Sequence, residues 1–397
     1  MEALNRDYAI SKIKALEEMC ACRPTSTMLG DLGSCYFTAG EPQRALPLLE
    51  TAWAKNKTSG LGVNLAMILK DLGRHAESLR VIEEAFWLSD KDDFYCRLGY
   101  AEALLRAGFW RQAWPLYSNA RPTQQGAALE VRLPKHIKEW FGAPIHPQQT
   151  LLVLNEGGLG DRISYPRYLL ELTKLGIKWK FHPSASLYPI FERIFPRENL
   201  VFDGDDIVAD FWCTAFSLPE KLDTMYTQQP PPLRLAPTPE SIAKYKFARP
   251  DNIPIVGLCY AAAELYQGDR KVRSLTEGQA MRLVSLTADK VRWVSLQHGT
   301  KLPIPVTNIY FDTWDDTMGL ISNLDAVVSV DTGVMHVAGA LDKPMAVLLS
   351  GNSCWKFGTK KSKIPLYPNA TFYRNEVCGL EHAIDLLITT IRNGTAW

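Results

Sequence analysis

Apolar residues recur at helical spacing through the first third of the chain, and the pattern repeats. Gly40, Gly73 and Gly108 each follow such a stretch, at separations of 33 (73 − 40) and 35 (108 − 73) residues. A small residue stands five positions after each glycine and an alanine twelve positions after it: Ala45, Ser78 and Ala113, then Ala52, Ala85 and Ala120. Small residues let antiparallel helices approach closely, and glycine permits the turn between them. The pattern predicts three successive helical hairpins.

A period near 34 residues built in this way resembles the tetratricopeptide repeat. Three copies are about the minimum that buries a continuous core. Two interpretations of these repeats stay open. They are either a helical cap that stabilises the rest of the chain, or a concave surface that docks an acceptor, a partner or a second subunit.

After Pro134 the pattern changes to strands that alternate with helices. Strands are predicted at 151–154, 178–182, 200–202 and 210–213, with a helix at 167–175. The proline-rich stretch 228–239 is stiff and extended, which is typical of a linker. Beyond it, strands are predicted at 253–259, 291–296, 308–311, 326–330 and 345–349, with helices at 334–341 and 376–392. Alternation of this kind predicts parallel sheets.

The expected fold class is therefore α/β, with two Rossmann-like domains that face a cleft, preceded by an all-α repeat domain. The predicted domains are residues 1–138 (helical repeats), 148–240 (first Rossmann-like domain) and 250–397 (second Rossmann-like domain with a terminal helix). Clefts between domains are favoured ligand sites.

A glycine-rich turn follows the apolar run 151–154. Gly157, Gly158 and Gly160 lack the Cβ atoms that would keep a ligand away from the backbone, and glycine tolerates positive φ. Asp161 then stands at the carboxyl end of the strand, where open α/β sheets bind ligands. The turn therefore predicts a functional site in the first Rossmann-like domain.

A second strand-to-helix turn lies in the second Rossmann-like domain, at residues 327–336. Asp331 or Thr332 suits the N-cap of the following helix, and Gly333 lets a phosphate come near the backbone. Free amides and the positive end of the helix dipole suit a diphosphate. His336, about one turn into the helix, is able to reach a phosphate oxygen or a ribose hydroxyl. A helix cap and a structural histidine are the competing interpretations of Asp331 and His336.

Composition narrows the possibilities only a little. A formal net charge of +1 gives no overall electrostatic footprint for nucleic acid, although the lysines between 356 and 363 mildly favour an anionic acceptor. No apolar run is long enough to span a bilayer, and we expect no signal peptide. The eight scattered cysteines favour reduced thiols and a cytoplasmic protein, with neither zinc nor disulfides.

Both turns resemble those of a known enzyme family. Residues 156–161 with Arg167, and residues 323–341 with Lys343 and Pro344, look like the catalytic and nucleotide-binding signatures of the heptosyltransferase-like glycosyltransferases that follow tetratricopeptide repeats in bacteria. Weaker similarities include Trp355 and Tyr367. The resemblance covers about residues 150–375. It implies the two-domain GT-B fold, a nucleotide-diphosphate sugar donor, and inversion at the anomeric carbon without a metal or other cofactor.

The resemblance also implies roles for particular residues. Asp161 matches the proposed general base. The positions that match donor- or nucleotide-binding residues are Gly158, Gly160, Lys271, Arg273, Gln297, Asp331, Thr332, Gly333 and His336. The chain departs from the family at residues 260–263, where Tyr-Ala-Ala-Ala replaces a turn that usually contains Trp and Gly. The expected partners are a nucleotide sugar and an acceptor glycan, protein or modified nucleic acid, and the chain is a possible homo-oligomer.

Two other functions compete with transfer. The altered turn at 260–263 is compatible with a repeat-based binding or scaffold protein whose glycosyltransferase domain no longer turns over. A dinucleotide enzyme is disfavoured because the spacing of Gly157, Gly158 and Gly160 is not G-x-G-x-x-G. The donor base, the donor sugar and the acceptor stay open, with ADP as the family default.

Overall fold

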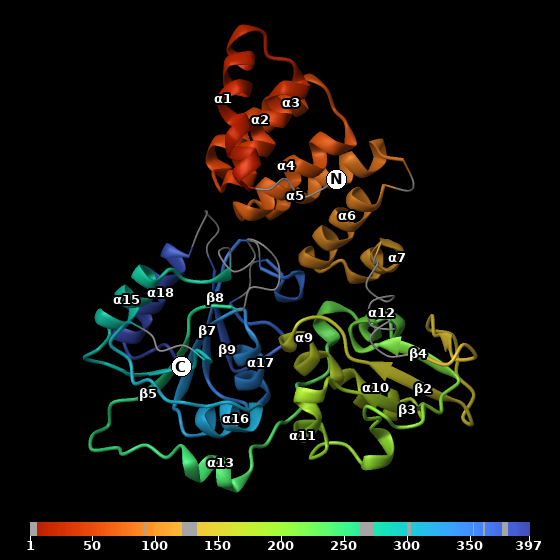
Figure 1. Ribbon diagram of the computed structural model, residues 1–397, viewed down its shortest axis with the longest axis vertical. Helices are drawn as coiled ribbons and strands as arrows, with labels where there is room; N and C mark the ends of the chain where they lie inside the picture. Colours follow the sequence, from red (N-terminus) through yellow and green to blue (C-terminus); the bar gives the residue numbers. More distant parts are fainter. Residues whose placement is uncertain are drawn as a thin grey trace. The chain divides into compact units, whose positions relative to one another are not determined.

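The first part of the chain folds into helices that pack in consecutive pairs (Figure 1). The computed structural model describes residues 6–90, 93–120, 133–262, 273–299, 303–351, 353–359, 362–374 and 380–397. The helices of this part are α1 (Arg6–Cys22), α2 (Ser26–Ala39), α3 (Pro42–Lys55), α4 (Ser59–Asp71), α5 (His75–Leu88), α6 (Phe94–Ala107) and α7 (Trp110–Ala120). They form one compact unit together with residues 350–359, called the helical unit below.

The repeated glycines turn the chain between helices, as the sequence predicts. Gly40, Gly73 and Gly108 have φ angles of +89°, +74° and +91°, in the left-handed region that favours glycine. The small residues of the pattern are buried between helices, namely Ala45, Ala52, Ser78, Ala85 and Ala113. The tetratricopeptide-like pattern is thus confirmed in the described part of the repeats.

The segment 350–359 belongs to the helical unit because it packs on the last hairpin. The ring of Trp355 contacts those of Trp110, Trp114 and Tyr117 edge to face, at centroid distances of 5.5, 5.9 and 5.9 Å. Such aromatic pairs are favourable beyond the area that they bury. The guanidinium of Arg106 also donates to the carbonyl oxygen of Ser353.

The remaining described residues form the α/β unit, which contains two parallel sheets. The sheet of its first half has the order β1-β4-β2-β3. Its strands are β1 (Lys138–Glu139), β2 (Thr150–Leu154), β3 (Lys178–His182) and β4 (Phe211–Thr214). In the register, Leu154 pairs with His182 on one side and with Thr214 on the other. The carboxyl ends of β2, β3 and β4 therefore lie at one edge, where the glycine-rich turn begins.

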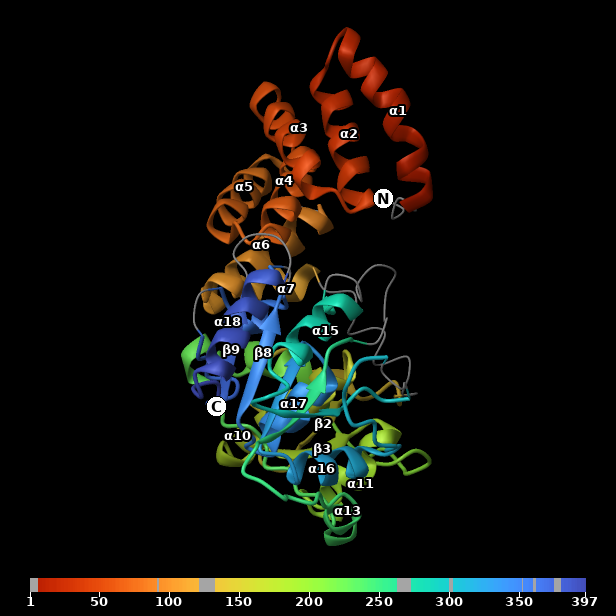
Figure 2. The ribbon, with the colours of Figure 1, turned by 90° about the vertical axis from the view of Figure 1, so that its left-hand side faces the viewer.

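The second half carries a parallel sheet of order β6-β5-β7-β8-β9. Its strands are β5 (Ile255–Cys259), β6 (Arg292–Ser295), β7 (Ala326–Val330), β8 (Met345–Leu349) and β9 (Ala370–Arg374). Strands β5, β7 and β8 are buried at every position, as expected for a sheet that is covered on both faces. The apolar stripe of α18 (Glu381–Arg392) packs against this sheet beside β8 and β9 (Figure 2). Two such parallel α/β sheets in one chain give the predicted GT-B architecture.

Short helices connect the strands of both halves. They are α9 (Leu159–Ser164), α10 (Leu169–Lys174), α11 (Tyr188–Phe191) and α12 (Leu218–Lys221) in the first half. The second half has α13 (Pro239–Lys244), α15 (Glu277–Ser285), α16 (Trp314–Ser322) and α17 (Gly333–Ala340). The predicted helix 167–175 differs in detail, because a 3-10 turn at Tyr165–Tyr168 precedes α10. Pro166 lacks the N–H that a continuous α-helix would use there.

Two predicted strands are wrong. At 200–202 only Leu200 bridges to Phe181, because the chain turns at once: the Asp205 carboxylate accepts from the amide of Phe202. At 308–311 the only bridge is Val294 to Thr307, just before the prediction, and the chain then enters α16. Strands β1 and β9 were not predicted. The predicted helix 376–392 begins at Glu381 in the structure, and residues 376–379 lie outside the described part.

The seven described cysteines are free thiols, and the eighth, Cys378, lies outside the described residues. Within the same residues, every helix is too short or too polar to cross a membrane.

Candidate active site

The glycine-rich turn joins β2 to α9 and requires glycine at two positions for different reasons. Gly157 has a φ angle of +81°, and a Cβ there would lie 2.9 Å from Oδ2 of Asp161. Gly160 has no positive φ and lies inside α9, so its constraint comes from packing alone. The sequence therefore folds the backbone tightly at the carboxyl edge of the first sheet.

Asp161 is held at the start of α9 by the turn itself. Its Oδ2 atom accepts from the amide of Gly158 at 3.2 Å, and the side chain is partly exposed. An acidic group in the first helical turn also interacts favourably with the helix dipole. The neighbouring Arg162 donates to the Gly157 carbonyl at 2.8 Å and to the Ser184 hydroxyl at 2.6 Å, which braces the turn from outside. The carboxylate is thus fixed in place and reachable by solvent.

The second turn joins β7 to α17. Thr332 is the N-cap residue, but its hydroxyl faces the strand ends, 3.0 Å from Ser329 Oγ and 3.7 Å from Cys259 Sγ. Burial raises the pKa of Cys259 to about 11, so this partner is a neutral thiol. Since the side chain of Thr332 does not cap the helix, the first amides of α17 are suited to an anion.

Arg273 reaches the same turn. Its guanidinium lies 3.4 Å from the carbonyl oxygen of Asp331 and 3.8 Å from the carboxylate of that residue. Asp331 itself is buried. A cation therefore lies beside the N-terminus of α17, where the family resemblance implies a counter-charge for phosphates. Lys271, the alternative cation, lies outside the described residues.

The two turns meet directly. Helices α9 and α17 pack against each other (Figure 1). A Cβ built on Gly160 would lie 2.4 Å from Cδ2 of His336, and one built on Gly333 would lie 3.8 Å from Cβ of Leu159. The structure thus brings the predicted carboxylate-bearing turn and the predicted anion-binding turn to one place.

His336 is a buried side chain with a defined partner. It is 1% exposed, and its Nδ1 atom lies 2.8 Å from the hydroxyl of Tyr367. Tyr367 in turn presses on α17, because a Cβ on Gly339 would lie 2.3 Å from its ring. The ring of His336 is therefore fixed by Gly160 on one side and by the tyrosine hydroxyl on another.

A buried arginine holds the two halves together behind this contact. Arg167 is 1% exposed and donates to the carbonyl oxygens of Ser164 at 2.8 Å, Pro230 at 3.3 Å and Leu366 at 2.9 Å. Its guanidinium also lies 5.1 Å from the ring centroid of Tyr367. Within the described part of the chain, no carboxylate pairs with it. The residue therefore acts as a donor to backbone carbonyls that come from both halves and from the segment between them.

The side chain of Gln297 forms hydrogen bonds with the turn after β5, which departs from the family pattern. Its amide accepts from the backbone N–H of Ala261 at 3.2 Å and donates to the carbonyl of the same residue at 3.0 Å. The amide of Ala262 donates to the Ser274 hydroxyl at 3.0 Å. Both contacts order residues 260–262 after β5. The structure thus gives Gln297 a role in supporting this turn, whereas its predicted contact with the donor stays a prediction.

Most predicted site residues lie in the two turns that meet, at Gly158, Gly160, Asp161, Asp331, Thr332, Gly333 and His336, with Arg273 beside them. The sequence interpretation gave no role to three residues of this region, Arg167, Tyr367 and Trp314, the last of which covers Gly333. Arg167 and Tyr367 lie within the motifs that resemble the heptosyltransferase-like family. That resemblance was the sequence signal that could have identified them. Among the described residues, no group of three or more His, Cys, Asp or Glu is arranged to hold a metal.

Comparisons with known proteins agree with the motifs. Residues 314–376, from α16 to just beyond β9, match Glycosyltransferase family 9 (heptosyltransferase). The match includes the whole of the β7–α17 turn and Tyr367. It confirms the resemblance to heptosyltransferase-like glycosyltransferases that the motifs indicate.

Individual proteins are similar at low identity. Protein FlbA of Caulobacter vibrioides is 23% identical over 373 residues, which is 84% of this chain and 61% of that protein, so the chain spans less than two thirds of its relative. The ADP-heptose lipopolysaccharide heptosyltransferase II of E. coli is 14% identical, with 63% of this chain and 100% of that chain covered and a TM-score of 0.42. A mutant O-GlcNAc transferase of Thermobaculum terrenum is 14% identical, with 100% and 88% covered and a TM-score of 0.37.

Proposed function

We propose that the protein transfers a sugar from a nucleotide-diphosphate donor to an acceptor hydroxyl with inversion at the anomeric carbon. The observation that carries the proposal is the direct packing of α9 on α17, which puts the Asp161 turn next to the start of α17 at Thr332. The match to glycosyltransferase family 9 over the second turn supports it.

Asp161 is the proposed general base. The acceptor hydroxyl attacks the anomeric carbon, its proton passes to the Asp161 carboxylate, and the bond from that carbon to the diphosphate breaks on the opposite face. The hydrogen bond from the Gly158 amide at 3.2 Å orients the carboxylate without neutralising it. Positioned bases of this kind contribute about 10²–10⁴-fold to a rate.

The leaving diphosphate is stabilised by the second half. The first amides of α17 and the positive end of its dipole stabilise the developing charge, and the Arg273 guanidinium, which lies 3.8 Å from the Asp331 carboxylate, adds a cation beside them. Preorganised donors of this type stabilise charge effectively because they need no reorganisation during the reaction. We propose that these groups meet the need that a metal ion meets in other transferases.

The substitution Asp161→Asn tests the proposal. Asparagine keeps an oxygen that can accept from the Gly158 amide, so the turn is retained, but it cannot take a proton. We expect transfer to fall by about 100-fold or more while the affinity for the donor is unchanged. The donor has to be identified before this assay. For that purpose the protein is incubated with a mixture of nucleotide sugars, and the mass of the ligand that stays bound is measured by native mass spectrometry.

Glu192→Gln, an exposed carboxylate of the same half, is the matched control and is expected to keep full activity. A fully active Asp161→Asn enzyme would show that another group takes the proton. If the wild-type chain binds a nucleotide sugar but neither transfers nor hydrolyses it, the domain serves as a binding module instead.

A further inference from the structure

The edge strand β1 brings several side chains to the carboxyl end of the first sheet that the proposed mechanism does not use. Strand β1 pairs with β4, and Glu139 lies opposite Trp212 in the register. Phe141 stands two residues beyond Glu139, and Thr214 stands two residues beyond Trp212. Phe141 and Thr214 therefore follow neighbouring strands to the same level, at the edge where open α/β sheets bind ligands.

Phe141 is presented by a turn that is held on both sides. The indole of Trp140 donates to the carbonyl oxygen of Ala143 at 2.7 Å, and a Cβ on Gly142 would lie 3.3 Å from the carbonyl oxygen of Lys221, the last residue of α12. The ring of Phe141 is nevertheless 77% exposed, and the Lys221 ammonium lies 5.4 Å from its centroid. A single exposed apolar side chain is common, but this ring is displayed in a defined position beside a cation.

The charges around this turn include one cation and several carboxylates. Burial raises the pKa of the Glu139 carboxyl, the Lys221 ammonium lowers it, and Glu220 raises it. Burial also raises the pKa of the Cys213 thiol, which Lys221 lowers and which Glu139 and Glu156 raise. In this set of described groups, one ammonium stands among three carboxylates. The edge therefore has no excess of positive charge, which disfavours an anionic ligand.

Three polar side chains at this edge have atoms without a hydrogen-bond partner among the described residues. They are Oε1 of Glu139, the hydroxyl of Thr214, and both the oxygen and the nitrogen of the Asn155 amide, which directly follows β2. Thr214 is 0% and Asn155 7% exposed. Buried polar groups are normally hydrogen-bonded, so each exception needs an explanation. A ligand with several hydroxyl groups would explain them, because each hydroxyl both donates and accepts, directly or through a bridging water.

The position of β1 also sets the size of such a ligand. Strand β4 lies between β1 and β2, and β2 leads into the turn that carries Asp161 on α9 (Figure 1). Neighbouring strands are about 4.8 Å apart, so β1 is about 10 Å from β2. This is about the length of two linked sugar rings. An acceptor whose hydroxyl meets Asp161 is therefore able to reach Phe141 only if it carries a second ring.

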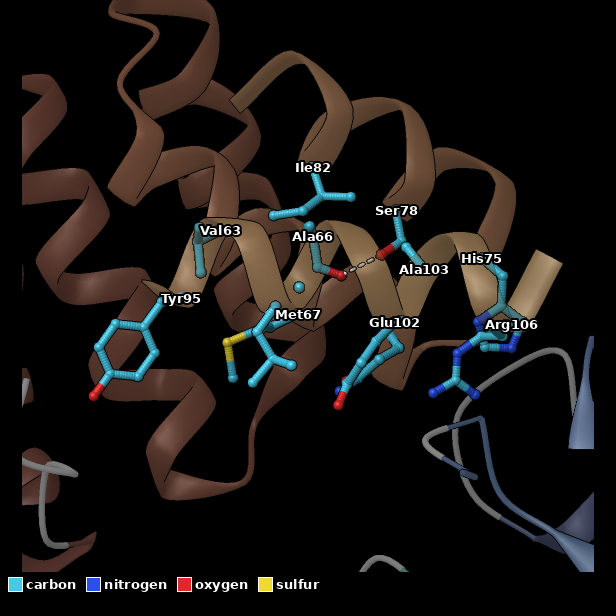
Figure 3. A pocket seen from close by; sticks show the side chains of 13 residues that line it. Val63, Ala66, Met67, His75, Ser78, Ile82, Tyr95, Glu102, Ala103 and Arg106 are labelled. Carbon is cyan, nitrogen blue, oxygen red and sulfur yellow. Dashed lines mark hydrogen bonds between the residues drawn. The ribbon is translucent and has the colours of Figure 1, made fainter. Parts of the chain in front are cut away.

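The cavity of the helical unit is of a different kind (Figure 3). It has a volume of about 180 Å³, lies between α4, α5 and α6, and includes Ile82 in its lining. The hydroxyl of Ser78 is already used there, since it donates to the Ala66 carbonyl at 2.7 Å. The buried charges of Arg106 and Asp71 act on each other. This cavity is therefore less suited to a ligand rich in hydroxyl groups than the edge beside β1.

We infer that the β1–β4 edge, made of Glu139, Phe141, Thr214 and Lys221, binds a neutral sugar ring of the acceptor. The face of Phe141 stacks on the C–H groups of the ring, which the negative face of an aromatic ring attracts. Glu139 accepts from one sugar hydroxyl and Lys221 donates to another. The acceptor is then an oligosaccharide of at least two residues. The inference rests on the proposed function, because the bound ring belongs to the acceptor that Asp161 activates.

Direct sugar binding to the full chain tests this inference. The probes are neutral disaccharides of glucose, galactose, mannose or N-acetylglucosamine, and the same disaccharides with a uronic acid as the terminal residue. Saturation-transfer NMR identifies which of them bind, and titration calorimetry gives their affinities. At least one neutral disaccharide should bind. Its uronic acid counterpart should bind more weakly, because the carboxylates of the edge repel it.

Variants assign the site. Phe141→Leu keeps an apolar side chain but loses the aromatic face, so it should weaken the bound disaccharide about 3- to 10-fold, whereas Phe141→Trp should keep the affinity. Lys221→Met removes a donor and should weaken binding, while Lys221→Gln keeps an N–H donor and should bind nearly as well as wild type. Val208→Ala is the matched control and should leave the affinity unchanged. Val208 is a 68% exposed apolar side chain that precedes β4, at the opposite end of the same strand.

A transfer assay separates this inference from the proposed function. With an oligosaccharide acceptor, Phe141→Leu should raise KM by the same factor and leave kcat unchanged. If a disaccharide binds in the expected way but the wild-type chain does not transfer, the proposed function fails and the sugar site stands. If wild type transfers and Phe141→Leu has an unchanged KM, the sugar site fails and the proposed function stands. The inference is also overturned if no neutral disaccharide binds, if the uronic acid binds more tightly, or if Val208→Ala weakens binding as much as Phe141→Leu.

Discussion

Replacing Gly160 by alanine tests the contact on which the candidate active site depends. The new Cβ would lie 2.4 Å from Cδ2 and 3.0 Å from Nε2 of His336. Carbon atoms pack without repulsion at about 3.5–4.0 Å, so the overlap exceeds about 1 Å. Gly160 has no positive φ, and the whole cost therefore comes from this contact.

The overlap cannot be relieved by a small side-chain rotation. His336 is 1% exposed and is tied to the Tyr367 hydroxyl at 2.8 Å, and Tyr367 is itself wedged against Gly339. Either α9 moves away from α17 or the histidine leaves its place. Overpacking of this kind costs about 1–3 kcal/mol. At about 2 kcal/mol, the melting temperature should fall by roughly 4–8 °C for a unit of this size.

Gly278→Ala is the matched control. Gly278 is also the second residue of a helix in the α/β unit, and its Cβ would meet only Thr276 Oγ1, at 4.0 Å. Alanine favours helix over glycine by about 0.8–1.0 kcal/mol, so this variant should be unchanged or slightly more stable. Scanning calorimetry compares the melting temperatures of the two variants with that of the wild type, and a transfer assay compares their activities. A Gly160→Ala protein with the stability and activity of wild type would show that α9 and α17 do not pack as described.

Three further predictions concern buried or hydrogen-bonded groups of the α/β unit. Arg167→Met leaves three carbonyls without their donor and should cost about 3 kcal/mol in urea unfolding; Arg167→Lys should recover part of this, and an unchanged midpoint in the Met variant would contradict the bridging role. Tyr367→Phe removes the partner of His336 and should cost about 1–2 kcal/mol in the same assay, whereas a neutral result would mean that water replaces the hydroxyl. Burial alone would raise the pKa of Asp316, but hydrogen bonds, above all from the Lys244 ammonium, hold it well below its usual range. A depressed carboxyl pKa contributes stability at neutral pH that is lost as the pH falls below about 4. Unfolding midpoints between pH 7 and pH 3 should therefore fall less in Asp316→Asn than in wild type, and equal slopes would refute this.

The sequence predicts the local geometry of both turns because their chemistry is local. A strand that runs into glycines and then a helix needs the backbone freedom of Gly157, and the cap position of Thr332 follows from the start of the apolar helix. The repeated glycines are predictable for the same reason, because Gly40 and Gly108 stand at helix ends where the backbone adopts a left-handed conformation. These features are set by residues within a few positions of one another.

Contacts between distant segments were not predictable in the same way. Gly160 and His336 are 176 residues apart (336 − 160), and no periodicity indicates that one ring fills the space left by the other. The burial of Arg167 is also invisible in the sequence, where an arginine normally indicates a surface. The wrong strand at 200–202 has a different cause, because an apolar run resembles a strand until the side chain of Asp205 forms a turn with it.

One short segment of the first half, residues 159–167, makes the described contacts with α17 and with Leu366, and it also carries Asp161. The packing face and the carboxylate lie on the same helix, at the adjacent residues 160 and 161. Substitutions at these two positions therefore test packing and catalysis separately. Gly160→Ala should lose stability through its contact with His336, while Asp161→Asn should keep stability and lose transfer, since its cap to Gly158 survives. If both variants lost stability alike, Asp161 would be a structural cap and the proposed base would have to be another residue. Opposite outcomes at these two neighbouring positions therefore distinguish a helix that only joins the halves from one that also positions the catalytic group.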